Sequence, residues 1–288
     1  MDARFMVFGI QDSGKTTFAA ALWHLVDSQE VPTALAKGKH FGDFTYLEEI
    51  SGTWAQGYAV ERTKSRQVEN IRVPLVHPES NSEITLEFDD LSGETFEHAF
   101  AQRYCTEAFV ELVKNAEGML LFMSASRNND DSVSILDVFD ADETGPQLAA
   151  DPNAWDPNKA PLQVQLVDLL QCLQKHPFEA KAMKVAVVIS AWDLVPDENV
   201  EAEEWLKKRY PLLEQYLQNS ESVLDHRIYG VSAQGGRLKK KKEGAGLDRD
   251  KLLAMTPASK RIQIVGPAIA EHDITRPLLW LAGLETPI

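Results

Sequence analysis

The chain has 288 residues, 44% of them hydrophobic, and a formal net charge of −15. This size and composition allow one large α/β domain with a sizeable core, and the negative charge argues against a general nucleic-acid binder. No apolar stretch reaches the length of a membrane span, no signal peptide opens the chain, and Cys105 and Cys172 are too few for a disulfide framework, so we expect a cytoplasmic protein.

Short apolar runs that indicate strands alternate along the chain with longer amphipathic patterns that indicate helices. This alternation predicts right-handed βαβ units and therefore an α/β fold, in which helices flank a mostly parallel central sheet. We expect residues 1–288 to form a single domain. The predicted strands cover residues 4–8, 68–76, 83–88, 118–124, 184–189 and 227–234 (a strand with its following turn), and the predicted helices cover 17–26, 96–115, 161–174, 200–217 and 273–281.

Three polar stretches interrupt this alternation, at residues 27–66, 125–160 and 235–265. Long segments of this kind are either partner-binding loops or disordered. The last stretch contains four consecutive lysines, residues 239–242, for which a solvated loop is the simplest interpretation. A phosphate-rich partner or an anionic membrane surface is the alternative, although four charges alone do not anchor a protein stably to a membrane.

Residues 9–16, with the sequence GIQDSGKT, form a complete phosphate-binding loop between a predicted strand and a predicted helix. Gly9 and Gly14 allow the backbone N–H groups to converge on a phosphate chain at the positive end of the helix. We expect Lys15 to be exposed in the loop, with its ammonium between the β- and γ-phosphates, and Thr16 to offer a hydroxyl to Mg²⁺. The further candidates for nucleotide contacts here are Gln11, Asp12, Ser13 and Thr17.

A second motif follows the predicted strand 83–88, where the sequence continues as Asp-Asp-Leu-Ser-Gly-Glu. Asp90 is placed to hold Mg²⁺ through water, and the Gly93 N–H is placed to contact a γ-phosphate. An acidic turn at the end of a strand is the simpler alternative.

The third and fourth motifs follow two later strands. Asp193 lies just beyond the apolar run 184–189, on the side of an α/β sheet where ligands bind. A carboxylate there accepts hydrogen bonds from N1 and N2 of guanine, which adenine does not supply. The alternative is a turn or N-cap aspartate before Pro196. In the last motif the backbone at Ala233 is a candidate contact to the guanine carbonyl, with Ser232 and Gln234 beside it.

These four motifs occur in the order found in Ras-like GTPases of the translation-factor-related class, and the chain resembles that superfamily from residue 1 to about 281. The narrower resemblance is to bacterial GTPases linked to conflict systems, sometimes described as double-GTPases. The resemblance implies a three-layer P-loop GTPase fold that binds GTP or GDP with Mg²⁺, and a catalytic set of Lys15, Thr63, Gly93 and Glu94.

The chain departs from the pattern of these GTPases at three positions. Their base motif is Asn-Lys-x-Asp, and here it is Ser190, Ala191, Trp192 and Asp193. The lysine stem that packs over the base is therefore lost, which predicts lower affinity or compensation by Trp192. Glu94 replaces the usual water-orienting glutamine, which predicts slow hydrolysis, and Gln234 stands where lysine is common.

The remaining metal contact is expected from a threonine before the second predicted strand, with Thr53 and Thr63 as candidates. We prefer Thr63, which lies in a basic segment close to strand 68–76, and Arg62 is a candidate for an arginine supplied in cis. A merely solvated charged loop is the alternative. We expect residues 50–66 and 91–98 to act as switch segments that bind a protein partner, since the polar composition of 50–66 leaves little packing to oppose its release.

Three functions fit these motifs. The first is a GTP-dependent molecular switch with weak hydrolysis. The second is an ATP-binding P-loop enzyme, which the missing Asn and Lys of the base motif favour. The third is a pseudo-GTPase scaffold, which Glu94 favours.

Overall fold

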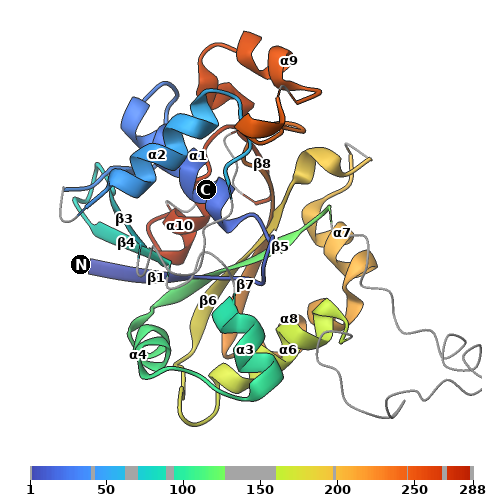
Figure 1. Cartoon of the computed structure of the whole chain (residues 1–288). Coiled ribbons are helices and arrows are strands. Elements are labelled where there is room, and N and C mark those ends of the chain that lie inside the picture. The colour runs from blue at the N-terminus through green and yellow to red at the C-terminus, as the bar shows by residue number, and fades with distance from the viewer. Residues whose placement is uncertain are drawn as a thin grey trace, which may run out of the picture.

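The computed structural model describes residues 2–39, 43–61, 71–88, 94–126, 160–196, 199–244, 246–267 and 271–285. Within them the chain forms an eight-stranded sheet with the order β2-β3-β4-β1-β5-β6-β7-β8 (Figure 1). The five strands from β4 to β7 in this order run parallel, and β2, β3 and β8 pair antiparallel at the two edges. The predicted α/β fold with a mostly parallel sheet is therefore confirmed. The strands are β1 (Asp2–Phe8), β2 (Ala36–Lys37), β3 (Ile71–Val76), β4 (Glu83–Phe88), β5 (Gly118–Ser124), β6 (Met183–Ser190), β7 (Leu224–Ser232) and β8 (Gln263–Val265).

Helices cover both faces of the sheet, and the strand side chains alternate between two hydrophobic cores (Figure 1). Phe5 and Val7 of β1 belong to the core that α1, α2 and α10 cover, whereas Met6 and Phe8 belong to the core that α4, α6 and α8 cover. Because both faces are buried, these strands appear in the sequence as continuous apolar runs. The α-helices are α1 (Lys15–Ser28), α2 (Thr45–Ala55), α3 (Glu94–Gln102), α4 (Glu107–Asn115), α6 (Leu162–Leu173), α7 (Ala202–Arg209), α8 (Pro211–Asn219), α9 (Arg249–Ala254) and α10 (Arg276–Leu281), and the 3₁₀ helices are η3 (Trp192–Leu194), η4 (Lys241–Glu243) and η5 (Ala258–Arg261).

The prediction of one helix over residues 96–115 is wrong, because the structure has two helices, α3 and α4, with a break between them. Arg103 adopts a left-handed conformation with φ 54°, which ends α3. Thr106 then starts α4, since its hydroxyl accepts a hydrogen bond of 3.2 Å from the Phe109 N–H. This capping residue outweighs an apolar periodicity that continues across the break.

The predicted helix over residues 200–217 is also two helices, α7 and α8. Pro211 is the first residue of α8, and a proline inside a continuous helix would remove a backbone hydrogen bond and clash with the preceding turn. Tyr210 between the two helices has φ −132° and ψ 58°, which lies outside the helical region. The last predicted helix is shorter than expected, because Asp273 accepts hydrogen bonds from the N–H and hydroxyl of Thr275 before α10 begins.

Two of the three polar stretches contain folded elements, contrary to the prediction of loops or disorder. The first contains α2, whose Leu47, Ile50 and Trp54 are buried in the core, so residues 50–55 are packed rather than loosely held. The third contains η4, α9, η5 and the edge strand β8. The composition of the first stretch concealed the helix, because its few apolar residues occur at helical spacing among many polar ones. Of the stretch 125–160, only residues 125, 126 and 160 are described.

The two folded stretches contact each other. Arg249 of α9 donates a hydrogen bond of 3.1 Å to the Gln56 carbonyl, and the Ala59 N–H donates one of 3.0 Å to the Lys239 carbonyl. The exposed lysine run takes part in this contact, because the Lys242 ammonium lies 3.9 Å from a Glu61 carboxylate oxygen. Across the described part of the chain, no helix is both long and apolar enough to cross a membrane.

Candidate functional site

Residues 9–16 form a tight loop between β1 and α1, in the predicted strand–loop–helix context. Gly9 and Gly14 have φ angles of 155° and 94°, which side-chain-bearing residues rarely adopt. A Cβ atom on Gly9 would lie 2.6 Å from Ser13 Oγ, and one on Gly14 would lie 2.6 Å from both Cβ and Oγ of Ser190. The loop is therefore packed closely on itself and on the end of β6, and both positions require glycine.

Lys15 is buried, with 3% of its surface exposed, and the expectation of an exposed lysine is therefore wrong. Its Nζ donates hydrogen bonds to the carbonyl oxygens of Gly9 and Ile10 at 2.6 and 2.8 Å, and it lies 3.4 Å from Ser13 Oγ. Lys15 is the first residue of α1, so its side chain turns back across the loop instead of extending into solvent. The ammonium thus rigidifies the loop and places a buried positive charge at the N-terminus of the helix.

Ser190 at the end of β6 holds the phosphate loop in place. Its hydroxyl donates a hydrogen bond of 2.7 Å to the Ser13 carbonyl, and its Cβ faces Gly14. Because Ser190 is the last residue of its strand, this bond fixes the loop relative to the motif that follows β6.

Asp193 follows β6 in the short helix η3, after a turn in which Ala191 has a left-handed φ of 53°. Its Oδ1 accepts a hydrogen bond of 2.5 Å from the Ser232 hydroxyl at the end of β7. The Ser232 oxygen in turn accepts the Gly235 N–H at 3.1 Å. The buried Ser232 therefore joins the third and fourth motifs and orients the Asp193 carboxylate.

Trp192 packs against the sheet rather than lining the cleft that holds Ala191 and Asp193. Its ring lies so close to Gly230 of β7 that a Cβ there would be 2.3 Å from the indole. The ring also packs edge-on with Trp205 of α7, at a centroid distance of 6.0 Å. In the structure the Trp192 ring therefore packs between β7 and α7.

One cleft of about 320 Å³ brings the first, third and fourth motifs together at the carboxyl ends of the parallel strands. Six of its residues were not predicted: Ser124 at the end of β5 and Ser126 just after it, Leu194 of η3, and Gly236, Arg237 and Leu238 after β7. Ser124 ends a buried parallel strand, a position that could have suggested it, whereas Arg237 lies in a stretch whose composition predicted only a loop. The cleft is lined by Asp12, Gly14, Thr17, Ser124, Ser126, Ser190, Ala191, Asp193, Leu194, Ala233, Gln234, Gly236, Arg237 and Leu238.

The predicted metal and switch residues Arg62, Thr63, Asp90 and Gly93 lie outside the described residues. Glu94 is described only as the first residue of α3. The alternative metal threonine is Thr53 of α2, whose hydroxyl donates a hydrogen bond of 3.0 Å to the Glu49 carbonyl one turn earlier, within the same helix.

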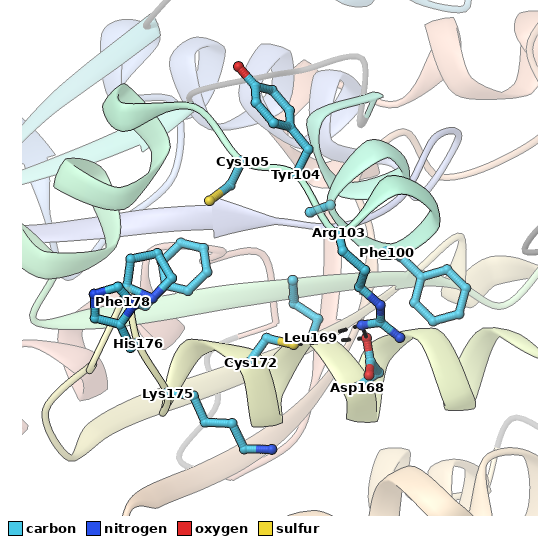
Figure 2. A pocket seen from close by; sticks show the side chains of 12 residues that line it. Phe100, Arg103, Tyr104, Cys105, Asp168, Leu169, Cys172, Lys175, His176 and Phe178 are labelled. Carbon is cyan, nitrogen blue, oxygen red and sulfur yellow. Dashed lines mark hydrogen bonds and ion pairs between the residues drawn. The ribbon is translucent and has the colours of Figure 1, made fainter.

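A second cavity of about 210 Å³ lies between the α3–α4 connection and the end of α6, and it shares no lining residue with the cleft (Figure 2). Figure 2 shows the Arg103 guanidinium directed at Asp168 of α6, with which it forms an ion pair. The same guanidinium lies 3.9 Å from Cys172 Sγ, and burial raises the pKa of that thiol. This ion pair connects the residue after α3, the helix that contains residues 94–98 of the second predicted switch, to α6.

A family model described as Double-GTPase 1 matches residues 6–281. The chain belongs to the Double-GTPase 1 family. The sequence-based assignment to the double-GTPases is thereby confirmed. No curated protein matches this Double-GTPase 1 chain.

Solved GTPase structures resemble this Double-GTPase 1 protein at low sequence identity. The GTPase-like domain of S. cerevisiae Ski7 bound to GTP is 11% identical over 100% of this chain and 51% of that one, with a TM-score of 0.45. A bacterial selenocysteine-specific elongation factor, EF-Sec, is 16% identical over 81% of this chain and 26% of that one, with a TM-score of 0.37. The SRb-GTP/SRX signal recognition particle receptor complex from Chaetomium thermophilum is 14% identical over 81% of this chain and 92% of that one, with a TM-score of 0.40. The chain thus spans about half of the solved Ski7 GTPase-like domain and about a quarter of the solved EF-Sec chain.

The residues present fit the guanine nucleotide that membership of the Double-GTPase 1 family implies. The two glycines leave no room for side chains, the ammonium of Lys15 is buried at the helix N-terminus, and the anchored Asp193 carboxylate lines the adjoining cleft. Phosphate binds favourably at such a helix start, while the carboxylate provides acceptors for N–H groups of a base.

Proposed function

We propose that this Double-GTPase 1 protein is a molecular switch that binds GTP, hydrolyses it slowly and thereby controls a protein partner. The observation that carries the proposal is the position of the Asp193 carboxylate, which lines the same cleft as Gly14 and Thr17 of the phosphate loop. A carboxylate accepts hydrogen bonds from both N1 and N2 of guanine, a pair of donors that adenine lacks. The Ser232 hydroxyl supports this role because it holds the carboxylate in one orientation.

The phosphate end of the proposed site consists of the loop N–H groups, the Lys15 ammonium and the Thr16 hydroxyl at the start of α1. Mg²⁺ would neutralise charge on the phosphates, and we propose Thr16, Thr63 and Asp90 as the residues that hold it. The buried ammonium of Lys15 already contacts two loop carbonyls, so it is oriented before a nucleotide binds.

Slow hydrolysis follows from Glu94, which stands where related GTPases have a water-orienting glutamine. A glutamate side chain accepts a hydrogen bond from water but has no amide proton to donate. The proposed switch segments carry Thr63 and Gly93, whose contacts require the third phosphate, and a protein partner would distinguish the two states there. The net charge of −15 favours a protein over a nucleic acid as this partner.

A P-loop ATPase is the second candidate, because Ala191 lines the cleft where a lysine stem would cover a guanine base in the related GTPases. Titration of GDP and ADP by calorimetry, in the presence of Mg²⁺, separates the two functions. We expect GDP to bind more tightly, and tighter binding of ADP would contradict the guanine function.

The Asp193→Asn variant tests whether the Asp193 carboxylate recognises guanine. An amide cannot accept both base N–H groups, so we expect the variant to lose about 1–3 kcal/mol of GDP binding, or about 5- to 150-fold in affinity, with little change for ADP. Asp225→Asn is the matched control, because it removes the same charge at an exposed position at the start of β7. An unchanged GDP/ADP affinity ratio in Asp193→Asn would show that the base is recognised elsewhere.

Single-turnover hydrolysis of GTP distinguishes the slow switch from a pseudo-GTPase scaffold. We expect a slow but measurable rate that Glu94→Gln increases, because the amide restores the donor that orients water. A complete absence of turnover in both proteins would favour the scaffold.

A further inference from the structure

Trp54 of α2 forms a hydrogen bond that joins the first polar stretch, residues 27–66, to the fourth motif, which lies at the turn after β7. Its indole Nε1 donates to the carbonyl oxygen of Ala233 at 2.8 Å, across 179 residues of sequence. Trp54 is 1% exposed, and Ala233 is 7% exposed and lines the cleft. A buried indole N–H without an acceptor is costly, so this contact strongly constrains both groups.

The Trp54 ring has a restricted position, because side chains from two other elements, η5 and α1, contact this residue. The buried Arg261 of η5 donates hydrogen bonds to the carbonyl oxygens of Trp54 and Ala55 at 3.4 and 3.2 Å. Its guanidinium also lies 5.5 Å from the centroid of the Trp54 ring. The centroid of the His24 ring of α1 lies 4.8 Å from the centroid of the Trp54 ring. The indole N–H is thus held in the direction of Ala233.

The hydrogen bond from Trp54 fixes the direction of the Ala233 C=O group. That direction in turn sets the direction of the Gln234 N–H. The peptide between Ala233 and Gln234 is planar and trans, so its N–H is directed opposite to its C=O. The Ser232 hydroxyl holds the other end of the turn, since it accepts the Gly235 N–H and donates to Asp193. The turn that follows β7 is therefore fixed on one side by Ser232 and on the other by Trp54.

We propose that Trp54 is a positioning residue for guanine recognition. Its indole N–H keeps the Ala233–Gln234 peptide in the orientation in which the turn presents backbone N–H groups to the guanine carbonyl, while Asp193 accepts N1–H and N2–H. This role rests on the proposed guanine function. A positioning role predicts an effect different from that of core packing alone. Loss of a core residue would weaken phosphate binding and base binding alike, whereas loss of the Trp54 N–H should weaken base binding only.

The Trp54→Phe variant keeps an aromatic ring and removes the N–H donor. We expect its affinity for GDP to fall about 3- to 10-fold, the effect of one lost hydrogen bond, while its affinity for ADP and for inorganic pyrophosphate stays within about 2-fold. Trp23→Phe is the matched control, because Trp23 is equally buried in the same core and its ring stacks on Phe44, whereas Trp54 donates its N–H to the turn after β7. It should leave all three affinities unchanged.

The smaller phenylalanine ring leaves a cavity that could itself disturb folding. A second variant therefore carries, at position 54, a tryptophan analogue in which sulfur replaces the indole N–H. It preserves the ring volume, and we expect the same selective loss of GDP affinity. Equal losses for GDP and pyrophosphate, or an unchanged GDP/ADP ratio, would overturn the role of Trp54 but leave the guanine function standing. A wild-type protein that prefers ADP would overturn the guanine function and the role of Trp54 with it.

Discussion

Gly230 of β7 offers a sharp test of how the base-binding motif is supported. A Cβ atom there would lie 2.3, 2.6 and 2.7 Å from Cδ2, Cε3 and Cε2 of the Trp192 ring. Carbon atoms pack best at about 3.5 Å or more, so in a Gly230→Ala variant the ring would have to retreat by roughly 1.2 Å. Trp192 is adjacent to Asp193 in η3, and the displacement is therefore expected to move the carboxylate as well.

Overpacking of this size costs about 1–3 kcal/mol, and the reduced freedom of the unfolded chain offsets about 0.4–1 kcal/mol of it. We therefore expect Gly230→Ala to lower the free energy of unfolding by about 1–2 kcal/mol, measured by urea denaturation. The affinity for GDP, measured by calorimetry on folded protein, should also fall because the carboxylate shifts. Gly52→Ala is the control, since a Cβ at Gly52 in α2 meets no atom within 4 Å and should stabilise the helix by up to about 1 kcal/mol.

A double-mutant cycle with Trp192→Ala identifies the cause. Removing the indole relieves the clash, so Gly230→Ala should be nearly neutral in that background, with a coupling energy of about 1–2 kcal/mol. If Gly230→Ala costs the same with and without the indole, the cost does not arise from Trp192 and the proposed support of Asp193 is refuted.

Three further measurements address the phosphate loop, acid stability and the switch. Lys15→Ala should abolish measurable nucleotide binding and also lower stability, since it removes two hydrogen bonds to loop carbonyls, and retained GDP binding in calorimetry would exclude Lys15 from the site. Burial tends to raise the pKa of Glu30, but hydrogen bonds from the Ser259 backbone and hydroxyl outweigh it and lower the pKa below 4.5. The ionised Glu30 carboxylate therefore stabilises the fold above about pH 4.5, and this contribution is lost as the pH falls through the lowered pKa. The free energy of unfolding of Glu30→Gln should then fall less steeply between pH 6 and 3 than that of the wild-type protein. Hydrogen exchange in α2 should slow with either GDP or a GTP analogue, whereas residues 56–66 should respond to the analogue alone; equal responses there would contradict the switch.

The sequence alone determined the features that depend on contiguous residues. The phosphate loop at residues 9–16 is defined by two glycines, a lysine and a threonine between a strand and a helix. The strands β1, β4, β5 and β6 follow from short apolar or alternating runs, and parallel strands place their following residues at one edge of the sheet. Sequence order and strand direction therefore suffice to assign Asp193 to the same cleft as the phosphate loop.

The tertiary structure decided what joins these motifs. The Ser190–Ser13 and Trp54–Ala233 hydrogen bonds span 177 and 179 residues, and no local pattern encodes partners at such separations. The direction of Trp192 and the burial of Lys15 likewise depend on which neighbouring groups leave room and supply acceptors. Local propensity and periodicity act within a few residues of chain, whereas close packing selects side-chain directions only once all the elements have met.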